Sequence, residues 1–205
     1  MSVVSIVLAG GNSLRLGRSK AMEKAGGQTL LQWVIDSLTL LDSEILVVIA
    51  PGQPPPRCLR EEVRIAVDLY PGKAALGGIY TGLAVSNSFH NLVVACDMPF
   101  LNLALLRYLI QLSADFDAVV PQIGGKIEPL HAIYSKNCLA PIEQQIKQGQ
   151  LKVRGFLDKV KVRYVDDQKI AQLDPQYLSF FNVNTLADLK RARALLKGHK
   201  TNPSN

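Results

Sequence analysis

The sequence predicts an α/β protein with a mostly parallel central sheet. Short apolar runs rich in β-branched residues recur along the chain, and they are continuous rather than alternating. Such runs suit strands that are covered on both faces. Segments with apolar residues at helical spacing separate these runs, and Gly- and Pro-containing turns bound them. The strand–helix–strand rhythm favours parallel strands that are joined by right-handed crossovers.

Expected strands and helices alternate along most of the chain. Strands are expected at residues 3–9, 44–50, 65–68, 91–97, 117–123, 128–135 and 162–166. Helices are expected at residues 29–41, 76–88, 103–113 and 138–149. Residues 178–196 are typical of a strand that turns into a C-terminal helix, with Asn184 or Thr185 as its N-cap. We expect one domain over residues 1–197 and a disordered tail over residues 198–205.

The composition excludes several classes of protein. Of the 205 residues, 48% are hydrophobic and 20% are charged, as in globular proteins, and no apolar run is long enough for a membrane helix. The net charge is +6, but aromatic residues make up only 6%, and the basic runs lack the aromatics that nucleic-acid readers interleave. We therefore expect small phosphorylated ligands rather than nucleic acid or membrane. Cys58, Cys96 and Cys138 form no CxxC pair, which favours reduced thiols in the cytoplasm.

The stretch "VLAGGNSLRLGRSK" follows the first expected strand and combines glycines with cations. In parallel sheets, ligands bind beyond the carboxyl ends of the strands. Gly10, Gly11 and Gly17 would let backbone N–H groups approach phosphate oxygens, and Arg15 and Lys20 could neutralise their charge. The spacing matches neither G-x-G-x-x-G nor a Walker-type GK[ST] loop. A phosphate-binding loop and an ordinary glycine-rich turn both fit this pattern.

Two aspartates stand at the carboxyl ends of expected strands, at the same end of the predicted sheet as the glycine-rich stretch. Asp97 closes the run at 91–97 and precedes Met98 and Pro99, which end the strand. Beside a triphosphate its natural role is to bind Mg²⁺, which prefers one or two carboxylates together with phosphate oxygens. The alternative is an N-cap for the helix that begins near residue 102. Asp68 could accept a hydrogen bond from a ribose or a base, or it could simply begin a turn.

Four motifs together resemble one family. "LAGGNSLRLGRSK", "VVACDMPFL", "EPLHAIYS" and "FFNVNT..DL" occur in the order found in the molybdenum cofactor guanylyltransferases, also called molybdopterin-guanine dinucleotide biosynthesis protein A. The resemblance covers residues 3–195. It implies a three-layer, Rossmann-like nucleotidyltransferase fold of the GTA type. It also implies Mg²⁺-dependent transfer of GMP from GTP to the terminal phosphate of molybdopterin, with release of pyrophosphate. Cofactor-delivery proteins or molybdoenzymes are further possible partners.

The resemblance also implies roles for particular residues. The guanine-nucleotide loop would comprise Leu8, Ala9, Gly10 and Gly11. Arg15 and Lys20 would stabilise the pyrophosphate, and Asp68 would contact the nucleotide. Asp97 would bind both the nucleotide and Mg²⁺. The remaining matched residues are Gly77, Gly78 and Gly82 beside the nucleotide, and Asn182 and Asn184 on the acceptor side.

The chain departs from the family pattern at four places. Ser19 replaces an aspartate that often precedes the lysine, "AALGG" at 74–78 replaces G-P-L-A-G, and Leu186 begins a segment that often reads P-E-D. An asparagine that some members carry after the second strand is not evident in "EILVVIAPG". Three alternatives therefore stay open. They are transfer from CTP or to another acceptor such as a sugar phosphate, a non-catalytic nucleotide sensor, and a basic α/β domain that binds other anions. His131 is expected to be a half-buried side chain with its hydrogen bonds satisfied.

Overall fold

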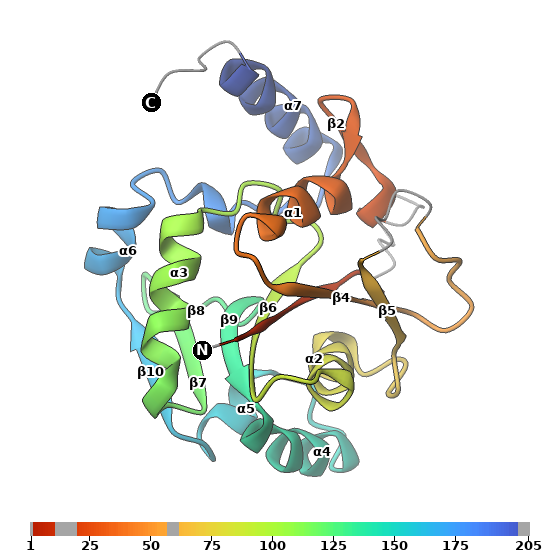
Figure 1. Ribbon diagram of the computed structural model, residues 1–205, viewed down its shortest axis with the longest axis vertical. Coiled ribbons are helices and arrows are strands. Elements are labelled where there is room, and N and C mark those ends of the chain that lie inside the picture. Colours follow the sequence, from red (N-terminus) through yellow and green to blue (C-terminus); the bar gives the residue numbers. More distant parts are fainter. Residues whose placement is uncertain (1, 11–19, 57–61, 201–205) are drawn as a thin grey trace.

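The central sheet of the computed structural model confirms the α/β prediction (Figure 1). The structure describes residues 2–10, 20–56 and 62–200. The sheet has the strand order β10-β7-β9-β6-β1-β4-β5, and β8 pairs with β7 beside this path. The strands are β1 (Val4–Leu8), β4 (Glu44–Ile49), β5 (Arg64–Val67), β6 (His90–Ala95), β7 (Ala118–Ile123), β8 (Lys126–Ile127), β9 (His131–Ser135) and β10 (Val162–Val165).

Most neighbouring strands in the sheet are parallel, and β9 is the exception within the main path. The first half of the sheet pairs β5 with β4, β4 with β1 and β1 with β6, all in parallel. β9 lies between β6 and β7 and is antiparallel to both. The chain reverses after β7 at Gly124 and Gly125, whose φ angles of +53° and +77° suit the tight turn of a hairpin. After this reversal, β9 runs antiparallel between β6 and β7.

Helices cover both faces of the sheet, which gives three layers (Figure 1). Residues of α1 (Leu30–Thr39), α3 (Leu103–Leu112) and α6 (Asp167–Leu173) join one apolar cluster with one face of the strands. Residues of α2 (Ala74–Val85), α4 (Leu139–Lys147) and α5 (Arg154–Leu157) form a second cluster with the opposite face. Burial on both faces explains why the strand sequences are continuously apolar. Two thiols, Cys96 and Cys138, are free and buried, and Cys58 lies outside the described residues.

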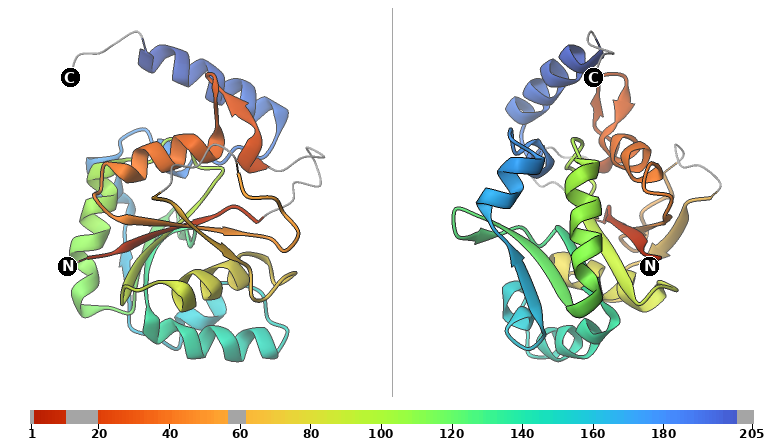
Figure 2. Two further views of the ribbon diagram at one scale, coloured as in Figure 1. Left: turned by 45° about the vertical axis from the view of Figure 1, so that its right-hand side comes forward. Right: turned by 60° about the vertical axis from the view of Figure 1, so that its left-hand side comes forward.

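A third, smaller cluster joins the two ends of the chain. The strands β2 (Lys24–Ala25) and β3 (Gln28–Thr29) pair in a short antiparallel hairpin, and α7 (Leu186–Lys200) packs beside it (Figure 2). The buried members of this cluster are Ala25 of the hairpin, Leu30 of α1, Val183, and Leu189, Ala192 and Leu196 of α7. Thr185 caps α7: its hydroxyl accepts the Asp188 N–H at 3.1 Å, and the Asp188 carboxylate accepts the Thr185 N–H at 2.8 Å. This reciprocal pair confirms Thr185 as the N-cap.

Several local predictions were wrong. The strand expected at the start of 178–196 is instead a 3-10 turn, η4 (Leu178–Phe180). The carboxylate of Asp174 accepts the N–H groups of Leu178 and Ser179 at 3.3 and 2.9 Å, so the segment folds onto this side chain rather than joining the sheet. The sequence analysis also missed α5, α6 and the β2–β3 hairpin. In addition, α7 continues to Lys200, so residues 198–200 belong to the helix; residues 201–205 lie outside the described part.

None of the described helices has the length and apolar character that would let it cross a bilayer.

Candidate active site

A cavity of about 690 Å³ lies at the carboxyl ends of β1, β4, β5 and β6. From β1 the chain moves outward to β4 and β5, and it then returns through α2 to β6 on the other side of β1. The cavity therefore lies at the point where the strand order reverses, which is where open α/β sheets bind ligands. Its lining includes five residues that the sequence analysis assigned to nucleotide binding, namely Leu8, Gly10, Asp68, Gly78 and Asp97.

The first loop leaves β1 between the ends of two neighbouring strands. The Ala9 N–H donates to the Val48 carbonyl at 2.8 Å, and the Cys96 N–H donates to the Leu8 carbonyl at 3.2 Å. A Cβ at Gly10 would lie 2.9 Å from the Ala50 nitrogen, a contact too short for any side chain. The loop can therefore leave the sheet here only through glycine. The side chain of Ala9 itself is buried in the core rather than facing the cavity.

Four predicted residues of this loop lie wholly or partly outside the described structure. Gly11 and Arg15 lie outside the described residues, as does Gly17. Lys20 begins the 3-10 turn η1 (Lys20–Met22), and the structure describes its backbone only. The roles of Arg15, Lys20 and Gly11 therefore stay predictions.

Asp97 lies two residues after the end of β6 and lines the cavity beside Cys96. The alternative role, as the cap of the next helix, is wrong for Asp97. Asn102 caps α3, since its side-chain oxygen accepts the Leu105 N–H at 3.0 Å. The carboxylate thus stands at the cavity without a capping role in α3.

Asp68 combines the two roles considered for it. Its N–H donates to the Ile49 carbonyl at 2.8 Å, which continues the β5 pairing, and its carboxylate accepts the Tyr70 N–H at 3.0 Å. The second bond is an Asx turn, in which the side chain bonds the backbone two residues further on. Because Asp68 also lines the cavity, it both begins a turn and faces the candidate site.

The start of α2 forms another wall of the cavity. Gly72, Ala74, Ala75 and Gly78 line the cavity, and the Lys73 side chain makes no capping bond. The first-turn N–H groups of a helix lack intrahelical partners and favour anionic ligands. Gly77 lies behind this wall, and a Cβ there would stand 2.5 Å from the Tyr70 carbonyl oxygen. Gly78 therefore faces the site, while Gly77 permits the close contact between α2 and the loop after β5.

The predicted acceptor-side asparagines flank a residue that is bonded to Asp97. The Val183 N–H donates to the Asp97 carbonyl at 2.9 Å. The Asn182 side chain donates to the Phe180 carbonyl at 3.1 Å, and the Asn184 N–H donates to the Asp188 carboxylate at 3.1 Å. Neither asparagine belongs to the lining of the 690 Å³ cavity. The structure therefore brings their segment to the backbone of Asp97 but not into that cavity.

His131 differs from its expectation. It is fully buried on β9, 4.9 Å from the ring of Phe180 between ring centroids, and neither ring nitrogen has a hydrogen-bond partner among the described residues. Burial lowers the pKa of this imidazole to about 3. The expectation of a half-buried histidine with satisfied hydrogen bonds was wrong. The ring packs instead as a neutral group against the segment that leads to Asn182.

Comparison with known proteins identifies the family. The sequence profile of the MobA-like NTP transferase domain matches residues 5–164. The chain belongs to this family. A probable molybdenum cofactor guanylyltransferase from Pelotomaculum thermopropionicum is 34% identical over 98% of this chain and 97% of its own length. The molybdenum cofactor guanylyltransferase of Desulfosudis oleivorans is 33% identical over 96% of both chains.

Solved structures agree with this placement. The molybdopterin-guanine dinucleotide biosynthesis protein A of Archaeoglobus fulgidus superposes on the MobA-like chain with a TM-score of 0.84 and 30% identity, covering 96% of this chain and 100% of its own. The 2-C-methyl-D-erythritol 4-phosphate cytidylyltransferase of Thermus thermophilus has a TM-score of 0.72 at 19% identity, covering 96% of this chain and 100% of its own. The second likeness concerns the fold alone. Together they confirm the nucleotidyltransferase fold that the motifs implied.

The MobA-like site also contains residues that sequence reasoning missed. The cavity lining further includes Val48, Ala50, Pro51, Pro71, Ala95 and Leu130. Most of these residues lie at or just after the carboxyl ends of β4, β5 or β6, so the rule that placed Gly10 and Asp97 could have found them. Leu130 could not be found in this way, because it precedes the antiparallel β9. Its carbonyl reaches the rim by accepting the Ala95 N–H at 3.1 Å.

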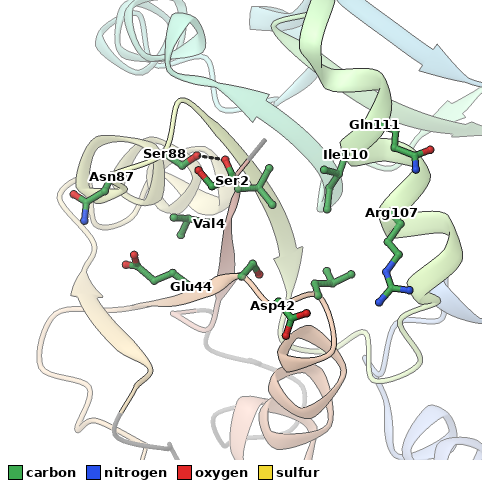
Figure 3. A pocket seen from close by; sticks show the side chains of 12 residues that line it. Ser2, Val4, Asp42, Glu44, Asn87, Ser88, Arg107, Ile110 and Gln111 are labelled. Carbon is green, nitrogen blue, oxygen red and sulfur yellow. Dashed lines mark hydrogen bonds between the residues drawn. The ribbon is translucent and has the colours of Figure 1, made fainter.

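A second hollow of about 440 Å³ lies at the amino ends of β1 and β4 (Figure 3). Asp42, Glu44 and Arg107 are the charged residues of its lining, and Arg107 donates to the Leu40 carbonyl at 2.9 Å. Its lining contains neither of the cavity aspartates nor any glycine of the first loop. Because this hollow lies at the amino ends of the strands and the cavity lies at their carboxyl ends, residues of the hollow can serve as controls in tests of the MobA-like site.

Proposed function

We propose that this protein is a molybdenum cofactor guanylyltransferase, which transfers GMP from GTP to the terminal phosphate of molybdopterin. The observation that carries the proposal is the cavity at the strand-order reversal, where Asp68, Asp97 and the beginning of the first loop meet. Support also comes from the guanylyltransferases that match the chain over nearly its full length. Because GTP is an intracellular metabolite, we propose the cytoplasm as the place of reaction. Protein partners would be those that deliver or receive the cofactor.

The reaction itself needs no nucleophilic side chain. An oxygen of the acceptor phosphate attacks the α-phosphorus of GTP in line, and the bond from that phosphorus to the bridging oxygen breaks. Pyrophosphate leaves with the electron pair of that bond. The acceptor is already an anion, so catalysis reduces to positioning and to stabilisation of charge on the phosphates.

The first-turn amides of α2 and the first loop are suited to orient the triphosphate. Gly72, Ala74 and Ala75 place uncapped backbone at the cavity, and such N–H groups bind phosphate oxygens or carbonyl groups. By resemblance, Arg15 and Lys20 supply the positive charge that stabilises the leaving pyrophosphate. Asn182 and Asn184 are proposed to contact the acceptor, on the side of Asp97 where the Val183 bond holds their segment.

The residues of the cavity fit a magnesium ion. Mg²⁺ is usually held by one or two carboxylates together with substrate phosphates, and both Asp68 and Asp97 line the cavity. Within the described residues, no cluster of three or more acidic, His or Cys side chains could form a site made of protein ligands alone. Asp97 would hold the ion together with phosphate oxygens of the nucleotide. The bound ion would neutralise charge on the phosphates as the bond to pyrophosphate breaks.

Calorimetric titration with GTP, ATP and CTP, each with Mg²⁺, tests the proposal. We expect a clear preference for GTP and, in an assay with molybdopterin, about a hundredfold lower kcat for Asp97→Asn, which corresponds to about 3 kcal/mol. Asp42→Asn at the distant hollow is the matched control, because Asp42 has a φ of +51° that asparagine tolerates.

Each departure from this result has a definite meaning. Preference for CTP would replace guanylyl transfer by cytidylyl transfer at the same site. Near-normal turnover by Asp97→Asn would overturn the metal-binding role. Absence of nucleotide binding by the unaltered protein would overturn the proposed function.

A further inference from the structure

Thr81 on α2 contacts the loop that carries Asp68. The Thr81 side chain is fully buried, and its hydroxyl oxygen accepts the Leu69 N–H at 2.9 Å. The same oxygen lies 3.0 Å from Asp68 Oδ1 and 2.9 Å from the Gly77 carbonyl oxygen. An ionised carboxylate and a carbonyl can only accept hydrogen bonds. The single hydroxyl hydrogen of Thr81 therefore serves both acceptors.

These contacts distinguish the two oxygens of the Asp68 carboxylate. Oδ1 accepts from the Tyr70 N–H and from the Thr81 hydroxyl, each at 3.0 Å. Within the described part of the chain, the hydrogen bonds to this carboxylate all end on Oδ1. Oδ2 is thus the oxygen that can accept from a ligand in the cavity that Asp68 lines.

Packing restricts the conformation of the loop after β5, which carries Asp68. The Tyr70 ring meets the Tyr80 ring edge-on, with 4.9 Å between centroids, and its hydroxyl donates to Glu143 at 3.1 Å. Helix α2 also packs so closely against this loop that only glycine fits at position 77. The orientation of the carboxylate is therefore determined by α2 and α4, not by the loop alone.

We infer that Thr81 is a positioning residue of the nucleotide site. Its hydroxyl holds Asp68 Oδ1, so that Oδ2 accepts a hydrogen bond from the bound nucleotide, either from a ribose hydroxyl or from a base N–H. This inference rests on the proposed function. The ordinary role of a helical threonine is a bond to the carbonyl four residues earlier, and such a bond alone would leave nucleotide affinity unchanged.

Three substitutions test this role by calorimetric titration with Mg²⁺ and GTP. Thr81→Val keeps the shape of the side chain and removes the hydroxyl, and we expect the Kd for GTP to rise about tenfold or more. Thr81→Ser keeps the hydroxyl and should restore affinity. Thr39→Val is the matched control, because the Thr39 hydroxyl also bonds a carbonyl of its own helix, that of Asp36 at 2.7 Å, but lies on α1. It should leave the Kd unchanged.

A double-mutant cycle separates positioning from stability. If Thr81 acts through Asp68, then Thr81→Val should add little to the loss of affinity caused by Asp68→Asn. A purely structural role would lower the thermal midpoint of Thr81→Val and leave the Kd of the folded protein unchanged. That result would overturn the inference. Should Thr81→Val fail to fold, Thr81→Ala removes the hydroxyl without β-branching in the helix and is judged by the same Kd.

The outcomes also separate the inference from the proposed function. If the unaltered protein binds no GTP, both fail. If it binds GTP and Asp68→Asn weakens binding, but the Thr81 variants lacking the hydroxyl bind normally, only the role of Thr81 is overturned. If Asp68→Asn itself binds GTP normally, the role of Thr81 is likewise overturned, while guanylyl transfer through Asp97 stands.

Discussion

The backbone N–H of Val183 donates to the carbonyl of Asp97 at 2.9 Å. This bond joins two segments far apart in the sequence, one at the end of the central strand β6 and the other before α7. Val183 is fully buried in the cluster that contains α7 and the β2–β3 hairpin, so packing fixes the Val183 end of the bond. The proposed metal ligand and the proposed acceptor segment are therefore joined by a direct backbone hydrogen bond.

Replacement of Asn182 by alanine should affect the acceptor more than the nucleotide. Asn182 adjoins Val183 but lies outside the lining of the nucleotide cavity. Loss of one hydrogen bond to a charged acceptor should raise the KM for molybdopterin about tenfold, while the Kd for GTP stays unchanged. Steady-state kinetics with varied molybdopterin, together with titration of GTP, measure the two effects. An equal loss in both would place Asn182 at the nucleotide instead.

Buried His131 should make the protein less stable in mild acid. Its pKa is about 3 in the folded protein against 6.5 as the ordinary value, so below about pH 6.5 the unfolded chain binds a proton that the folded protein does not. Above pH 6.5 the titration of His131 does not lower the free energy of unfolding. Between pH 6.5 and about 3 it lowers this free energy by up to about 1.4 kcal/mol per pH unit.

Urea unfolding at several pH values measures this effect. The His131→Phe variant keeps an aromatic ring against Phe180, and it should lose less stability than the unaltered protein between about pH 7 and about pH 5. Parallel curves for the two proteins would show that His131 is not held neutral by burial.

Alanine at position 77 should destabilise the wall of the cavity. The added Cβ would stand 2.5 Å from the Tyr70 carbonyl oxygen, and backbone cannot move aside as a flexible side chain can. We expect a loss of about 1–3 kcal/mol in the free energy of unfolding. Gly78→Ala is the comparison, because its Cβ would meet only the end of the Leu8 side chain, at 3.1 Å. Equal losses in the two variants would contradict this reading of the contact.

Much of the candidate site could be predicted from short patterns. The continuous apolar runs before Leu8 and Asp97 indicate buried parallel strands, and the carboxyl ends of such strands meet at one edge of the sheet. That rule alone brought Gly10, Asp68 and Asp97 to the same rim, where the cavity lies. The N-cap Thr185 could also be predicted from the sequence, because helix caps depend on residues only three positions apart.

Other features arise only from contacts between distant segments. No local pattern shows that β9 enters the sheet antiparallel between β6 and β7, because strand order is a property of the whole sheet. The burial of His131 and the failure of residues 178–181 to form a strand follow from that arrangement and from the carboxylate of Asp174.

The sequence by itself determined the fold class, the family and the two aspartates of the site. These depend on periodicity, on strand ends and on motifs that each lie within a few residues. Only the tertiary structure decided which groups hold those aspartates, such as the Thr81 hydroxyl at Asp68 and the Val183 N–H at Asp97. The physical reason is that a hydrogen bond needs two atoms about 3 Å apart, and packing of helices on the sheet sets that distance.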